Sequence, residues 1–140
     1  MVRLYALAEK KQVQVITCSL PVTGSLSYQD EAGRCYIGMD DGPNWTRSEQ
    51  RVRLAHELGH CITGSFYSRY TPLNTRQRLE NRADRYAVRR LIQPEALDDA
   101  VAEGCTELWQ LAEHFGVTED FMKKAVSLYT HGNLSAELYF

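Results

Sequence analysis

The spacing of apolar residues in this 140-residue chain changes from strand-like alternation in the first third to a helical period afterwards. Near the start, short apolar stretches broken by Pro21 and Gly24 predict a brief helix and three strands, the last two joined as a hairpin. The expected elements are a helix at 2–10, strands at 13–18, 25–29 and 34–39, helices at 46–64 and 80–91, a helix starting at Pro94, and two more delimited by Gly104 and Gly116. This pattern predicts an α+β fold with a small antiparallel or mixed sheet packed with several helices.

The first long helix has clear start and stop signals. Thr46–Glu49 has the form of a capping box, and Gly64 suits the left-handed position that follows a helix C-terminus. At 100° per residue, His56, Glu57 and His60 share one arc of this helix, and the apolar side chains share the opposite arc. The apolar arc contains Leu54, Ala55, Leu58, Cys61 and Ile62. We therefore expect the helix to pack on a core and to present two histidines and a glutamate elsewhere.

Residues 56–60 read His-Glu-Leu-Gly-His, which is the H-E-x-x-H pattern of helical zinc sites in metallopeptidases. Residues i and i+4 share a helix face, so His56 and His60 can both reach one small cation. Glu57 would lie beside water at the metal and could take its proton as a general base. The pattern predicts one Zn²⁺ per chain. Two surface histidines on an ordinary helix are the plainer interpretation, but a third ligand is available further along the chain.

Glu80 is the expected third ligand, because a catalytic zinc has three protein ligands and one open position. Residues 80–91 have a helical period, and Glu80 and Asp84 share a face that is otherwise apolar. Carboxylates on such a face are costly unless they are paired or bound to metal. Asp84 is expected to accept the N–H of a ligating histidine, most simply His56, and to fix its tautomer. The alternative for Glu80 is a surface residue near a helix start, favoured by the helix dipole.

Taken together, these motifs resemble the ImmA/IrrE family of metallopeptidases. The resemblance rests on the zinc motif, on Glu-x-x-Ala-Asp-x-Tyr-Ala at 80–87 and on Leu-Ile-Gln-Pro at 91–94, and it extends over about residues 30–130. Tyr86 stands where the family has Phe, and Arg82 stands where many members have Glu. The spacing of Glu80 and Asp84 is similar to that of gluzincins generally.

The resemblance implies a regulatory zinc endopeptidase that cleaves a helix-turn-helix repressor, often one from a prophage or another mobile element. It also implies one zincin-like domain over residues 1–140, with the helix-turn-helix-like segment at about 106–130 packed as part of it. In zincin folds the strand beside the zinc helix, here 35–39, commonly forms a sheet edge to which a peptide can add. A plain hairpin strand is the alternative. Candidates for stabilising the oxyanion, left open by the sequence, are Tyr67, Tyr70, His114 and His131.

Composition adds limits on partners and location. Hydrophobic residues make up 44% and charged residues 24%, and the net charge is −2, so neither nucleic acid nor an anionic membrane is an expected partner. No apolar run reaches membrane-spanning length and no signal-peptide cleavage site is visible, which suggests a cytoplasmic protein. The widely spaced Cys18, Cys35, Cys61 and Cys105 are expected to be free, mostly buried thiols. Cys61 is expected in the core rather than at the zinc.

Other features admit other functions. A basic stripe opposite the Glu80 face suits an acidic partner or, more commonly, a solvated helix face. It consists of Arg78, Arg82, Arg85 and Arg89. DNA binding by the segment at 106–130 is disfavoured, because its second helix begins with Glu119 and Asp120, which phosphates repel. The rival functions are a zinc-containing module that binds a regulator without cutting it, and a toxin–antitoxin component. Glu57 argues for a peptidase over a binding module, because a structural zinc site needs no base.

Overall fold

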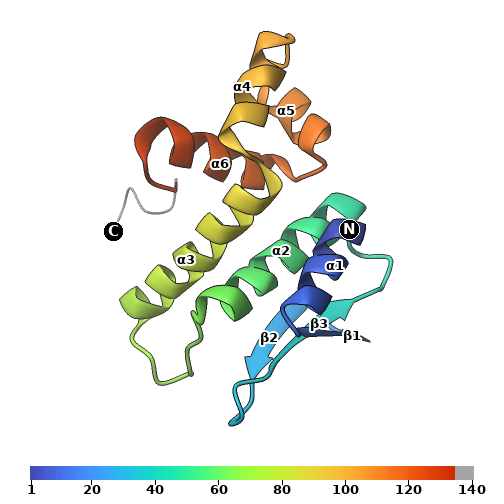
Figure 1. Ribbon diagram of the computed structural model, residues 1–140, viewed down its shortest axis with the longest axis vertical. Coiled ribbons are helices and arrows are strands. Elements are labelled where there is room, and N and C mark those ends of the chain that lie inside the picture. Colours follow the sequence, from blue (N-terminus) through green and yellow to red (C-terminus); the bar gives the residue numbers. More distant parts are fainter. Residues whose placement is uncertain (135–140) are drawn as a thin grey trace.

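The computed structural model describes residues 1–134, which contain six helices and one three-stranded sheet (Figure 1). The elements are α1 (Val2–Lys10), β1 (Gln14–Cys18), β2 (Ser25–Gln29), β3 (Cys35–Asp40), α2 (Arg47–Thr63), α3 (Leu73–Leu91), α4 (Pro94–Ala102), α5 (Leu108–Phe115) and α6 (Glu119–His131). This is the α+β architecture that the apolar pattern predicts.

The sheet has the order β1-β3-β2, with β1 parallel and β2 antiparallel to β3. Asp30 closes the hairpin, since its carboxylate accepts the backbone N–H groups of Ala32 and Arg34. The expectation that residues 35–39 form a sheet edge is wrong. β1 pairs with one side of β3 and β2 pairs with the other, so β3 is the central strand. The edge strand next to the zinc-motif helix is β2.

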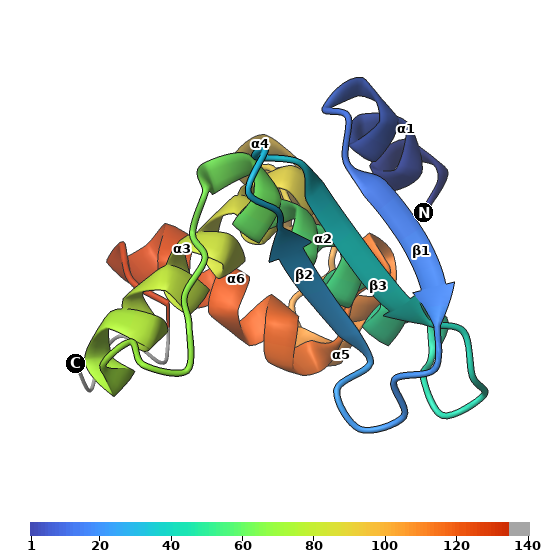
Figure 2. The ribbon, with the colours of Figure 1, turned by 90° about the horizontal axis from the view of Figure 1, so that it is seen from below.

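Helix α2 lies across one face of this sheet, with α1 next to β1 (Figure 2). Ile37 of β3 and Leu54 and Leu58 of α2 are fully buried where the two layers meet. On the other face of the sheet, the side chains of Leu26 and Tyr28 are exposed. The apolar arc of α2 therefore packs on the sheet, and its histidines are left to face α3.

Helix α3 runs beside α2 in the opposite direction (Figure 1). It begins at Leu73, two turns before the helix expected from residue 80. The sequence hides this start because residues 73–79 contain only two apolar side chains, and one of them, Leu73, is 78% exposed. Glu80 therefore lies in the helix interior, so proximity to a helix start does not account for it.

The last three helices pack at one end of the α2–α3 pair (Figure 1). Pro94 begins α4 at a position where its missing N–H costs nothing, and Gly116 takes the left-handed conformation between α5 and α6. Apolar residues of α6, including Met122 and Ala125, belong to the same buried cluster as Leu54 and Leu58. The helix-turn-helix-like segment is thus part of this core. No helix among residues 1–134 is long and apolar enough to cross a membrane.

The cysteines differ from the expectation of four free thiols. Cys35 of β3 and Cys61 of α2 form a disulfide across the helix–sheet interface, with their Cα atoms 5.9 Å apart. Packing of α2 on β3 creates this pairing, and a separation of 26 residues gives no hint of it. Cys18 and Cys105 are free and only partly buried. Cys61 packs against the core, as its place on the apolar arc suggests.

Candidate metal centre

The close crossing of α2 and α3 brings the histidines of the zinc motif on α2 together with Glu80 and Asp84 of α3. At the crossing, Gly59 lies so near Ala83 that a Cβ on Gly59 would be 2.5 Å from the Ala83 carbonyl oxygen. His60 follows Gly59 and Glu80 lies one turn before Ala83, so both side chains emerge on the same side of the contact. The capping box of Thr46 and Glu49 fixes the start of α2, and Gly64 ends it with φ of 68°.

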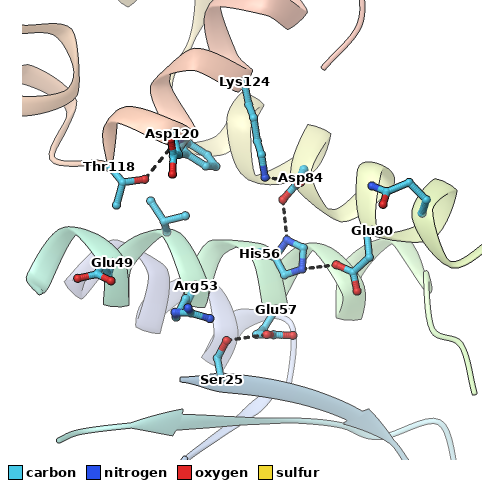
Figure 3. A pocket seen from close by; sticks show the side chains of 13 residues that line it. Ser25, Glu49, Arg53, His56, Glu57, Glu80, Asp84, Thr118, Asp120 and Lys124 are labelled. Carbon is cyan, nitrogen blue, oxygen red and sulfur yellow. Dashed lines mark hydrogen bonds and ion pairs between the residues drawn. The ribbon is translucent and has the colours of Figure 1, made fainter. Parts of the chain in front are cut away.

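Three electron-pair donors from these helices converge on one point. Figure 3 shows two of them, His56 and Glu80. His56 Nε2 lies 2.7 Å from Glu80 Oε2, and His60 Nε2 lies 3.1 Å from His56 Nε2 and 3.3 Å from Glu80 Oε2. All three atoms lie within 4.8 Å of one another. Two imidazoles and one carboxylate at such distances form a possible metal site.

The other nitrogen of each histidine is held by a separate acceptor. His56 Nδ1 donates to Asp84 Oδ1 at 2.7 Å, and His60 Nδ1 donates to the backbone carbonyl of Ser65 at 2.6 Å. With Nδ1 protonated in both neutral rings, both Nε2 atoms carry lone pairs, and these point toward each other and toward a carboxylate. A cation between them satisfies all three donors, so the residues present fit a bound metal ion. The nitrogen-rich donor set suits zinc better than magnesium or calcium.

Without a metal, protons balance the charges of this cluster. Burial lowers the pKa of His56, but the hydrogen bonds of His56 to Asp84 and Glu80 have a larger combined effect and raise this pKa to about 10. Burial tends to raise the pKa values of the Glu80 and Asp84 carboxyl groups, but their hydrogen bonds with His56 and other neighbours lower both below their ordinary values. A metal ion entering the site would compete with the proton on His56.

Glu57 lies beside the three donors but is not one of them. It is 7% exposed, and its Oε2 accepts a hydrogen bond of 2.7 Å from the hydroxyl of Ser25 (Figure 3). Ser25 begins the edge strand β2, so the sheet orients this carboxylate. Nothing in the sequence singles out Ser25, because serine is common at the start of a strand and its presence there does not indicate a functional role. The contact depends on how β2 packs against α2.

Of the four oxyanion candidates, Tyr67 is the one next to the cluster. Its hydroxyl donates to Glu80 Oε1 at 2.6 Å, and this hydrogen bond, together with burial, raises the pKa of Tyr67 to about 12. Tyr70 is 79% exposed and accepts a hydrogen bond from Arg69 instead. His114 on α5 and His131 at the end of α6 are exposed and do not line the cavities at the cluster.

Two cavities open on either side of Glu57. A cavity of about 270 Å³ runs along β2 and reaches Phe66 and Tyr67. A second cavity, of about 620 Å³, lies between α2, α3 and α6 and reaches Phe121 and Lys124 (Figure 3). His56, Glu57 and Glu80 line both. The cluster therefore faces space on two sides, as a site must if it acts in the middle of an extended chain.

Comparison with known proteins agrees with this geometry. The family model Peptidase_M78, which describes the IrrE N-terminal-like domain, matches residues 8–127 and so includes all the side chains of the cluster. Among curated proteins, none matches the chain. The match spans most of the sequence, from α1 into α6. The chain therefore belongs to the ImmA/IrrE family of metallopeptidases.

Proposed function

We propose that this protein is a zinc-dependent endopeptidase that cleaves a helix-turn-helix transcriptional repressor. The observation that carries the proposal is the convergence of His56, His60 and Glu80 on one point, with the buried carboxylate of Glu57 beside them. Membership of a metallopeptidase family supports the same chemistry. One Zn²⁺ per chain, held by these three residues, would polarise the scissile carbonyl and lower the pKa of water.

In this proposal Glu57 is the general base. A carboxylate that binds no metal can take the proton of the attacking water and pass it to the leaving amine. The Ser25 hydroxyl occupies Glu57 Oε2, so it fixes the orientation of the carboxylate and leaves Oε1 for the reaction. Asp84 holds the His56 ring so that Nε2 faces the metal position.

Tyr67 is our choice for the group that stabilises the oxyanion. It lines the smaller cavity together with Glu57, and its raised pKa keeps the hydroxyl protonated at neutral pH. A protonated phenol can donate to the oxygen on which charge develops. The Tyr67 hydroxyl donates to Oε1 of Glu80, a proposed metal ligand, so it lies close to the proposed metal position.

The free edge of β2 offers a binding site for the substrate backbone. On either side of β2, the Gly24 carbonyl accepts the N–H of Asp40 in β3, and Asp30 N–H donates to Arg34, just before β3. Such bonding alternates along an antiparallel pair. The N–H and C=O groups of Ser25, Ser27 and Gln29 therefore point away from β3, and within residues 1–134 no strand pairs with that edge. An extended peptide added there would run along the cavity that contains Glu57.

We propose the repressor substrate on the family resemblance, and with it we propose that the protein acts in the cytoplasm. We further propose that residues 1–140 act as one metallopeptidase domain. Cleavage of generic peptides is expected to be slow, because a regulatory protease relies on docking to raise the local concentration of one bond.

The test uses purified protein and each helix-turn-helix protein encoded by a neighbouring open reading frame. The pair is incubated with zinc, with a chelator, and with zinc restored after chelation, and the products are identified by intact-mass spectrometry. We expect one internal cut that disappears on chelation and returns with zinc. A zinc-loaded protein that binds the repressor and leaves it whole would support the rival function, a regulator-binding module.

A further inference from the structure

The C-terminal helices contact both helices that carry the proposed zinc ligands. The Arg51 guanidinium of α2 donates to the backbone carbonyls of Phe115, the last residue of α5, and of Gly116, which follows it. Further along, Lys124 of α6 extends to α3, where its Nζ lies 3.0 Å from Asp84 Oδ2 (Figure 3). The C-terminal helices are thus fixed to α2 and α3 by polar contacts at two separate points.

The two oxygens of Asp84 have different partners. Oδ1 accepts from His56 Nδ1 at 2.7 Å, and Oδ2 accepts from Lys124 Nζ at 3.0 Å. The Asp84 side chain is only 13% exposed, so little water is available to replace either partner. Rotation about the last bond of an aspartate side chain has a broad, shallow energy profile. A carboxylate held at one oxygen can therefore swing, whereas one held at both oxygens has a fixed plane.

We propose that Lys124 is a positioning residue for the metal centre. By holding Asp84 Oδ2, it keeps Asp84 Oδ1 in line with His56 Nδ1, and this sets the direction in which His56 Nε2 points. The position of α6 is thereby linked to the geometry of a ligand on α2. This inference rests on the proposed function only through the metal site, and it is independent of whether a peptide is cut.

Two properties of Lys124 support this role over that of an ordinary surface charge. Its side chain is 36% exposed and lines the larger cavity beside His56 and Asp84. The neighbouring Lys123 is exposed, and no partner for its ammonium group is found in the described part of the chain. The two lysines therefore form a matched pair, with the same charge on the same helix but only one of them at the site.

The experiment compares Lys124→Met, Lys124→Arg and the control Lys123→Met. Zinc affinity is measured by competition with a chromophoric chelator. We expect Lys124→Met to lose at least ~10-fold in affinity, the scale seen when a group supporting a ligand is removed. Lys124→Arg, which keeps a cationic donor, should recover most of this loss. Lys123→Met should stay within about 2-fold of wild type, as surface changes usually do.

A second readout follows His56 directly. In zinc-loaded protein labelled with ¹⁵N-histidine, the His56 Nδ1–H resonance reports the hydrogen bond to Asp84. It should shift upfield or broaden in Lys124→Met and stay unchanged in Lys123→Met. A general loss of stability would not select this resonance. If Lys124→Met fails to fold, Lys124→Gln replaces it and the same criteria apply.

The proposal is overturned if Lys124→Met keeps both the wild-type zinc affinity and the wild-type His56 resonance. It is also overturned if Lys123→Met lowers affinity as much as Lys124→Met does. Wild-type protein that takes up no zinc contradicts the metal site itself. Zinc-loaded wild-type protein that cuts no repressor contradicts the peptidase function and leaves the role of Lys124 standing.

Discussion

Gly59 of α2 and Ala83 of α3 are in backbone contact, and the space for a side chain on Gly59 is filled by the Ala83 carbonyl oxygen, 2.5 Å from where a Cβ would stand. This contact sets the distance between the two helices that carry the proposed ligands. His60 and Glu80 meet because their helices can approach this closely. The close packing of α2 on α3 therefore explains why residue 59, within the zinc motif, is a glycine.

Gly59→Ala should separate the helices and destabilise the protein. Overpacking costs typically 1–3 kcal/mol and here exceeds the gain of about 1 kcal/mol from replacing a helical glycine by alanine. Urea unfolding should show lower stability, and zinc affinity should fall with it. The control is Gly42→Ala in the loop before α2, where the atom nearest to a Cβ would be an Asp40 side-chain oxygen at 3.3 Å, with no backbone atom in the way. Equal stability of Gly59→Ala and wild type would contradict this account of the crossing.

Glu80 and Asp84 should differ in their effects on metal binding. Glu80→Ala removes a ligand and should abolish tight zinc binding, as His60→Ala should. Asp84→Ala leaves all three ligands and should lower affinity by about 10–100-fold. Chelator competition and metal analysis, with wild type expected to carry one zinc per chain, measure both. A larger loss from Asp84→Ala than from Glu80→Ala would show that the two roles are reversed.

Stability of the metal-free protein should pass through a maximum in mildly acidic solution. The pKa of His56 is raised from 6.5 to about 10, so its stabilisation is complete below about pH 6.5 and is lost as the pH rises toward 10. The pKa values of Glu80 and Asp84 are lowered, so their stabilisation is present above about pH 5 and is lost on acidification. Urea unfolding should therefore show greater stability at about pH 5.5 than at about pH 9.5.

The variant His56→Gln supplies the control for this pH dependence, because glutamine does not titrate. The alkaline loss of stability should be smaller in that variant than in the wild type. Zinc binding to wild-type protein near pH 8 should also release a proton from His56, which calorimetry in buffers of different ionisation enthalpy detects. An identical alkaline decline in both proteins would assign the loss to other groups.

The Cys35–Cys61 disulfide should add measurable stability. Loop-closure entropy for a separation of 26 residues gives about 3.5 kcal/mol, and the double variant Cys35→Ser/Cys61→Ser should lose this amount. Reduction of the wild type by a dithiol should have a similar effect. The control is Cys18→Ser/Cys105→Ser, which alters only free thiols. Detection of four reactive thiols in unfolded, unreduced protein would rule out the disulfide.

The helices and the metal motif are the parts that the sequence alone predicts well. Thr46, Glu49 and Gly64 mark α2 because capping is local chemistry, and i, i+4 spacing places His56 and His60 without tertiary information. Glu80 and Asp84 stand out because charge on an apolar face needs a partner.

The features that the sequence misses depend on packing between distant segments. The position of β3 at the sheet centre, the Cys35–Cys61 bond, the Ser25 contact to Glu57 and the Lys124 contact to Asp84 join residues at least 20 positions apart. The start of α3 is missed for a different reason, because its first two turns are polar and carry no amphipathic signal.

The most direct test of the central claim is the activity of Glu57→Gln. Glutamine keeps the size and polar end of the side chain but cannot act as a base, and Ser25 can still donate to its carbonyl oxygen. The variant should fold, carry one zinc per chain and bind its repressor, while the cleavage rate falls at least ~10²-fold, the usual scale for losing a general base. Cleavage is read from the length of the repressor on a gel after co-expression. A repressor cut equally by wild type and Glu57→Gln, with zinc present in both, would contradict the account.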